Sequence, residues 1–171
     1  LLKGRFGHGR QALLSAHPER RLITAMSVDL VGAVGRSTEV DPEVLAEFLA
    51  HYKECVTRNI TSAGGLVVKT VGDGMLACFG WPIAREDAAE CAIRAGFAII
   101  AAVRQLKGLE PPSQQARIGI ATGIVVIGGD ADDATTDISL AGEAPILAAG
   151  LGHLAAPDTI AISEATHRQL G

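Results

Sequence analysis

Two aspartates stand where apolar segments of the chain end, and both are candidates for binding a metal ion. Asp29 lies near the end of the apolar segment 22–30, and Asp73 lies between two glycines. Two carboxylates from separate loops suit Mg²⁺, which proteins bind through one or two carboxylates together with substrate phosphates. A Gly-Asp-Gly sequence also makes a good turn by itself, so a purely structural role for Asp73 stays open.

Two further features close to these aspartates can serve an anionic ligand. Lys69 interrupts an apolar segment four residues before Asp73, either as an edge-strand lysine that opposes aggregation or as a hydrogen-bond donor to a ligand. A glycine-bearing turn follows Leu30, and backbone amides in such a turn can hold a phosphate. An ordinary strand-to-helix turn is the alternative. The amides in question belong to Val31, Gly32, Ala33 and Val34.

The elements that must position these residues follow from periodicity and turn chemistry. Residues 22–30 read as a buried strand, and Asp41-Pro42 begins a helix that glycines 64 and 65 end. Residues 66–71 and 75–79 form a hairpin around the turn 72–74, and a second long helix opens at 85–87. The remaining expected elements are strands 117–121 and 124–127 around Thr122-Gly123, a loop 128–136, strands 137–140 and 159–162, and helices 142–154 and 163–170. The leading order, β-α-β-β-α-β, is that of the ferredoxin-like fold.

Composition and charge limit the class of protein. The chain has 171 residues, of which 48% are hydrophobic and 20% charged, enough for one globular domain. A formal charge of −4 argues against a sequence-independent nucleic-acid binder. Three cysteines without CxxC spacing predict free thiols and a cytoplasmic location, and the five histidines show no metal spacing. No apolar segment approaches the roughly 20 residues of a membrane span, so we expect no membrane contact by this segment.

Five stretches, taken in order, resemble the catalytic domain of class III adenylate/guanylate cyclases. They are SVDLVG (27–32), KTVGDG (69–74), RIGIATG (117–123), DISLAGE (137–143) and AAPDTIAISEAT (155–166). The resemblance covers residues 20–171 and implies the α+β cyclase fold, an antiparallel-rich sheet with helices packed on it. We therefore expect a linker or arm over 1–18 and a cyclase homology domain over 19–171, without the family's C-terminal strands.

The resemblance also implies a chemistry, conversion of ATP to cyclic AMP and pyrophosphate. Two Mg²⁺ or Mn²⁺ ions assist attack of the 3′-hydroxyl on the α-phosphate. In this sequence the metal ligands fall on Asp29, Asp73 and the backbone carbonyl of Leu30. The triphosphate contact falls on the amides of 31–34, and the base-selecting pair on Lys69 and Ser139. A lysine in that pair favours ATP over GTP, because it can donate to adenine N1.

Two positions depart from the family. Members carry an asparagine that orients the ribose and an arginine that stabilises the transition state, whereas this chain has Ile146 and Gly150. Losing one preorganised donor costs about 10²–10³ in rate, and an arginine on a transferring phosphoryl group contributes roughly 10³–10⁵. In this family the sites form between two domains, so we expect a homodimer, or a heterodimer with another cyclase domain. An isolated homodimer of this chain is expected to be weak or inactive.

Three functions therefore remain as hypotheses. The first is an adenylate cyclase in signal transduction. The second is a catalytically impaired cyclase-homology domain that binds metal-nucleotide, or pairs with a complete partner chain, as a regulatory module. The third is a dimerisation or sensor module of the same fold, in which Asp29 and Asp73 are only turn residues.

Overall fold

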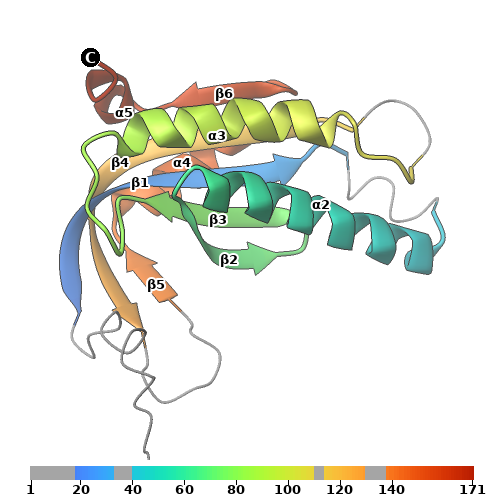
Figure 1. The fold of residues 1–171 in the computed structure, drawn as a ribbon, viewed down its shortest axis with the longest axis horizontal. Helices are drawn as coiled ribbons and strands as arrows, with labels where there is room; N and C mark the ends of the chain where they lie inside the picture. The colour runs from blue at the N-terminus through green and yellow to red at the C-terminus, as the bar shows by residue number, and fades with distance from the viewer. Residues whose placement is uncertain (1–17, 33–39, 110–113, 130–137) are drawn as a thin grey trace, which may run out of the picture.

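The fold is built on one β-sheet (Figure 1). The computed structural model describes residues 18–32, 40–109, 114–129 and 138–171 of the chain. The elements, in chain order, are β1 Glu19–Leu30, α2 Pro42–Ser62, β2 Leu66–Val71, β3 Gly74–Phe79, α3 Ala88–Val103, β4 Ala116–Gly129, β5 Ile138–Ala141, α4 Glu143–Leu154, β6 Thr159–Ile162 and α5 Glu164–Arg168. None of the helices in these ranges is long and apolar enough to cross a membrane.

The sheet has the strand order β2-β3-β1-β4-β5. The four strands β2, β3, β1 and β4 run antiparallel to their neighbours, in the ferredoxin-like arrangement that the sequence predicts. Strands β5 and β6 share the outer edge of β4: β5 pairs antiparallel with its end, and β6 pairs parallel with its beginning. The predicted α+β arrangement, an antiparallel-rich sheet with helices packed on it, is confirmed.

Helices cover both faces of the sheet. In Figure 1, α2 and α3 lie in front of the sheet and α4 lies behind it. Met26, Val28 and Leu30 of β1 pack with the residues of α2 and α3, whereas Ile23 and Ala25 pack with α4. Because successive side chains of a strand point to opposite faces, Asp29 belongs to the face covered by α4.

The ends of most elements fall close to where local signals place them. Asp41 caps α2, since its Oδ1 accepts a hydrogen bond from the Glu43 amide at 2.8 Å, and Pro42 opens the helix. Strands 66–71 and 159–162 have the predicted bounds. Ser163 caps α5, although that helix is shorter than predicted, ending at Arg168. The strand predicted over 137–140 corresponds to β5 at Ile138–Ala141, and residue 137 lies outside the described residues.

The prediction of two strands around Thr122-Gly123 is wrong, because β4 runs unbroken through both residues. Thr122 lies opposite Thr24 of β1, with their hydroxyls 2.9 Å apart, and also contacts the Thr166 hydroxyl of α5 at 3.0 Å. At Gly123, a Cβ would lie 3.3 Å from the Cβ of Ala144. The glycine therefore serves close packing of α4 on the strand. It does not make a turn there.

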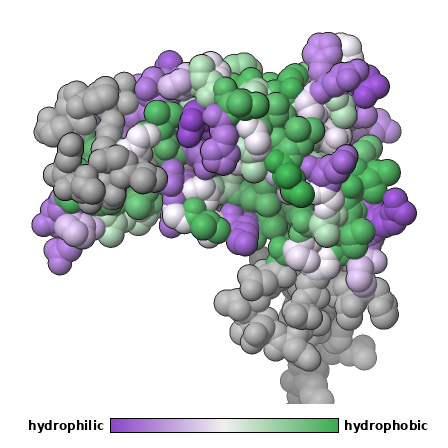
Figure 2. All heavy atoms as spheres, turned by 180° about the vertical axis from the view of Figure 1, so that it is seen from behind, coloured by the Kyte–Doolittle hydropathy of each residue, from purple (hydrophilic) through white to green (hydrophobic). Residues whose placement is uncertain are grey.

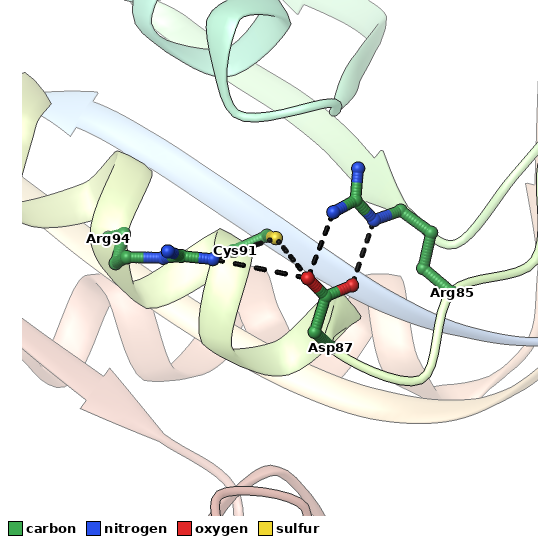
Figure 3. A network of polar contacts seen from close by, with 4 residues as sticks. All are labelled: Arg85, Asp87, Cys91 and Arg94. Carbon is green, nitrogen blue, oxygen red and sulfur yellow. Dashed lines mark hydrogen bonds and ion pairs between the residues drawn. The ribbon is translucent and has the colours of Figure 1, made fainter.

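A polar network surrounds the start of α3 (Figure 3). Asp87 accepts two hydrogen bonds from Arg85, each 2.9 Å, and a third contact from the Cys91 thiol at 3.4 Å. These bonds hold the pKa of the Asp87 carboxyl well below its usual range. Arg85 also lies over Gly64, where a Cβ would meet its Nη1 at 2.7 Å. The side chain of Arg85 therefore lies close to the turn that ends α2 and precedes β2.

Candidate active site

The fold brings the two predicted carboxylates together at the end of β1. The turn between β2 and β3 lies against this end, and Asp73 accepts a hydrogen bond from the Leu30 amide, 3.2 Å from N to Oδ2. On the other side, a Cβ at Gly74 would lie 3.0 Å from Oδ1 of Asp29. The turn that carries Asp73 therefore lies against the end of the strand that carries Asp29, although the two residues are far apart in the chain.

Asp29 is held in surroundings that disfavour its charge. Burial raises the pKa of this carboxyl, nearby His153 opposes the rise, and the negative charge of Asp73 adds to it. Its Oδ2 is buried and has no hydrogen-bond partner among the described residues. A buried carboxylate oxygen without a partner beside a second carboxylate is what a divalent cation would satisfy.

The carboxylate pair fits a hard cation such as Mg²⁺ or Mn²⁺. Oxygen ligands from one or two carboxylates, completed by water and substrate phosphates, are the usual donors for Mg²⁺. Among the described residues, no three His, Cys, Asp or Glu side chains gather around one metal position. Asp29 and Asp73 would therefore hold the ion only as a pair, with the other ligands supplied by solvent and nucleotide.

Lys69 and Ser139, the predicted base-selecting pair, line one cavity of about 430 Å³. They come from β2 and β5, which occupy opposite ends of the strand order, yet the two strands contact each other. In Figure 1 the beginning of β1 and the end of β4 bend in the same direction, and β5 lies beside the bent end of β4. The Ser139 hydroxyl donates to the Gly128 carbonyl at 3.1 Å, and Lys69 is exposed.

A second cavity, of about 250 Å³, is lined by both Lys69 and Asp29. Asp29, Lys69 and His153 line it together with Pro145 and Ala149 of α4. Since Lys69 borders both cavities, they adjoin one another. A ligand with a base at one end and phosphates at the other could therefore pass Lys69 between the cavity of Ser139 and the cavity of Asp29.

The backbone amides proposed for phosphate are only partly described. The Val31 amide donates to the Gln115 carbonyl at 2.8 Å, so it already has a partner. Gly32 has a φ of 76°, in the left-handed region that favours glycine. Ala33 and Val34 lie outside the described residues.

The two departures from the family lie on the outer side of α4. Ile146 is 75% exposed, and a Cβ at Gly150 would have nothing within 4 Å. One turn of helix separates them, and the exposed Leu154 continues the same stripe. Figure 2, which views the face opposite to that of Figure 1, shows hydrophobic side chains among polar ones there. Neither position lines the cavities around Asp29 and Lys69.

Two residues near the carboxylates carry no signal in the sequence. Tyr52 of α2 is completely buried, its hydroxyl has no partner among the described residues, and burial, then Asp73 and Asp29, raise its pKa. His153 lines the cavity of Asp29, although the histidine spacing indicates no metal site. Periodicity places Tyr52 in the core and His153 on a helix, and only the packing of α2 and α4 brings them to Asp29.

A close approach of α4 to the sheet places His153 in this position. A Cβ at Gly119 of β4 would lie 1.9 Å from the Ala148 carbonyl oxygen and 2.3 Å from the Gly152 amide nitrogen. A Cβ at Gly152 would lie 3.5 Å from Oδ2 of Asp29. The last turn of α4 therefore rests directly on β4, beside Asp29. Arg117 fixes it further, since its Nη1 donates to the His153 carbonyl at 3.4 Å.

Comparison with known proteins agrees with this geometry. The family profile described as the adenylate and guanylate cyclase catalytic domain matches residues 16–171. The chain belongs to this family. It is 32% identical over 155 residues to an uncharacterised protein, R02095, of Rhizobium meliloti (strain 1021). That alignment covers 90% of this chain and only 15% of the relative, so the chain corresponds to a small part of that protein.

Solved structures of cyclase domains share the fold of this chain. The guanylyl cyclase Cya2 is 30% identical, with a TM-score of 0.83, and the match covers 90% of this chain and 80% of that one. The adenylyl cyclase CyaB from P. aeruginosa is 26% identical, also with a TM-score of 0.83, covering 90% and 82%. The cyclase domain thus has both adenylyl and guanylyl enzymes among its structural neighbours.

Proposed function

We propose that this domain binds ATP with divalent cations and converts it to cyclic AMP and pyrophosphate, in signal transduction. The observation that supports the proposal is that Lys69 lines both the cavity of Ser139 and the cavity of Asp29, while Asp73 bonds to the end of the strand that carries Asp29. Mg²⁺ or Mn²⁺ bound by the carboxylates would activate the 3′-hydroxyl and neutralise the triphosphate. The base would lie in the cavity of Lys69, whose ammonium can donate to adenine N1.

Each part of this chain has a distinct task in that reaction. Asp29 and Asp73 bind the cation, and the Leu30 carbonyl adds a further oxygen. The hydrogen bond from the Leu30 amide orients the Asp73 carboxylate toward the end of β1. Lys69 and Ser139 select and orient the base, and the turn after β1 contacts the triphosphate. As in the family, we propose that a homodimer or a heterodimer with another cyclase domain completes the site.

The outer side of α4 favours a second function, that of an impaired cyclase-homology domain. Ile146 is exposed without a polar group, and Gly150 has no side chain. A partner site facing this stripe receives no hydrogen bond from it. A domain with this surface would bind metal-nucleotide itself, or pair with a complete chain as a regulatory module. Its turnover as an isolated homodimer is then very low.

The experiment that separates the two functions measures cyclic AMP from purified protein with ATP and Mn²⁺ or Mg²⁺. Activity of the wild-type chain that disappears in Asp29→Asn supports the enzyme, and activity that persists in this variant contradicts the metal site. The double variant Ile146→Asn/Gly150→Arg restores the two missing donors. An increase of at least about 10³ in rate is expected if the carboxylate half is intact.

Calorimetry completes the test for a domain without turnover. Binding of ATP and Mn²⁺ by wild-type protein, lost in Asp29→Asn, supports the regulatory module. Absence of binding at millimolar concentration would leave Asp29 and Asp73 as turn residues and would refute both proposals.

A further inference from the structure

A further cavity lies between the end of α2 and the start of α3. Its volume is about 490 Å³, within the range of sites that hold small molecules. It shares no described lining residue with the cavities of Asp29 and Ser139, so it is separate from the proposed active site. Two arginines, Arg85 and Arg94, line it, and none of its described lining residues is an aspartate or a glutamate.

The surroundings of this cavity carry an excess of positive charge. Both guanidinium groups lie beside the carboxylate of Asp87, which does not itself line the cavity, and Figure 3 shows them on either side of it. The bonds from Arg85 hold the pKa of Asp87 well below its usual range, so this carboxyl is ionised at neutral pH. Two positive charges therefore face one negative charge.

Each arginine keeps donors that no described protein group uses. Arg85 donates to Asp87 through Nε and Nη2, while its Nη1 has no hydrogen-bond partner among the described residues and points away from Asp87 in Figure 3. Nη1 lies against Gly64, where a Cβ would be only 2.7 Å away. Arg94 is held more loosely, because its Nη2 is 4.0 Å from Asp87, too far for a hydrogen bond, and its side chain is 64% exposed.

The end of α2, which borders the cavity, opposes an anion only weakly. The C-terminus of a helix carries a partial negative charge on its unpaired carbonyls. Here the amides of residues 63–65 donate to the carbonyls of Ile60 and Thr61, so these two carbonyls are already hydrogen-bonded. The guanidinium of Arg85 beside Gly64 further offsets the negative charge of this helix end.

We propose that this cavity binds a phosphate-type oxyanion between Arg85 and Arg94, either inorganic phosphate or the phosphate group of a small organic molecule. A guanidinium presents its N–H donors in a planar fork that matches phosphate, and such charge-assisted hydrogen bonds are stronger than neutral ones. The small side chains of Ala95 and Ala98 leave room for an organic group. The inference does not rest on the proposed function, because no residue of the metal or base site takes part.

The test measures binding of inorganic phosphate and of phenyl phosphate by isothermal titration calorimetry, with EDTA present so that no cation occupies the site of Asp29. Wild-type protein should bind at least one of them at millimolar concentration. Arg85→Gln and Arg94→Gln should each weaken binding at least about tenfold, because each removes charge-assisted hydrogen bonds. Tighter binding of phenyl phosphate supports an organic phosphate as the ligand, and equal binding supports the free ion.

Arg168→Gln is the matched control for Arg94→Gln. Arg168 is 69% exposed and lies 3.9 Å from the carboxylate of Glu164, so its surroundings resemble those of Arg94. This variant should bind phosphate as wild type does. Because Arg94 is exposed, Arg94→Gln should melt within about 4 °C of wild type, which verifies that it is folded.

Three results would overturn the phosphate site. They are absence of binding by wild-type protein at millimolar concentration, unchanged binding in both Arg85→Gln and Arg94→Gln, and an equal loss in Arg94→Gln and Arg168→Gln, which would indicate only unspecific attraction of anions. None of these results bears on the metal site, which the variant Asp29→Asn tests separately.

Discussion

The close contact between α4 and β4 at Gly119 allows a sharp test of how the site is assembled. Replacing this residue by alanine adds a single methyl group. The added Cβ would lie 1.9 Å from the Ala148 carbonyl oxygen and 2.3 Å from the Gly152 amide nitrogen. Both neighbours are backbone atoms, so no side chain can rotate away to make space. The whole helix must move instead.

The size of the movement follows from these distances. An ordinary contact begins at 3.4 Å, so the oxygen of Ala148 must retreat by about 1.5 Å, which is 3.4 minus 1.9. Overpacking of a well-packed core typically costs about 1–3 kcal/mol, and more when backbone must shift. We expect a loss near the upper end, about 3 kcal/mol. For a domain of this size each kcal/mol lowers the melting temperature by about 2–4 °C, giving a decrease of roughly 6–12 °C.

Gly150→Ala is the matched control, because a Cβ there has nothing within 4 Å. It replaces glycine by alanine within α4 and should stabilise the protein by about 0.5–1 kcal/mol. The assay is thermal unfolding of both variants by circular dichroism, together with Mn²⁺ titration. Gly119→Ala should also weaken Mn²⁺ binding, since the last turn of α4 packs beside Asp29 and its displacement would disturb that carboxylate. A Gly119→Ala variant as stable as wild type would refute the close packing of α4 on β4.

Three further predictions concern the site itself. Tyr52→Phe removes a buried hydroxyl that has no hydrogen-bond partner among the described residues. The free energy of unfolding, measured by chemical denaturation, should therefore rise by up to about 1–3 kcal/mol. A loss of stability would show that the hydroxyl makes a hydrogen bond. Asp29→Asn should be more stable than wild type at neutral pH without metal. Burial raises the pKa of the Asp29 carboxyl, so the wild-type protein loses stability as the pH rises above 3.8, the usual pKa of that carboxyl. That advantage should vanish in unfolding curves recorded below pH 3.8, and an advantage independent of pH would contradict the reasoning. Lys69→Glu should weaken ATP binding relative to GTP binding in competition titrations, because a carboxylate accepts hydrogen bonds from guanine whereas a lysine donates one to adenine. An unchanged ratio of the two affinities would exclude Lys69 from base selection.

Part of the site follows from local sequence alone. The Gly-Asp-Gly turn places Asp73 at the tip of the hairpin because glycine adopts the turn conformation, and Gly72 indeed has a φ of 60°. The apolar segment before Asp29 forms a strand, and the Asp41-Pro42 pair begins α2. These are short-range properties, set by side-chain periodicity and by capping, so the order of elements was predictable.

The continuity of β4 was not predictable from such signals. Thr122-Gly123 resembles a turn, yet a neighbouring threonine on β1 and the packing of Ala144 keep the strand extended. Partners from β1 and α4 are distant in the sequence, and their contacts override the local preference of the glycine.

The sequence by itself predicted most of the elements, their order, the family and the candidate residues for a metal and a base. Only the tertiary structure decided that Lys69 and Ser139 border one cavity, because this depends on the curvature that brings β2 to β5. It also decided that His153 lies beside Asp29, because two glycines, Gly119 and Gly152, let α4 rest on the sheet. Which side of a helix faces which carboxylate is set by long-range packing, and no local pattern encodes it.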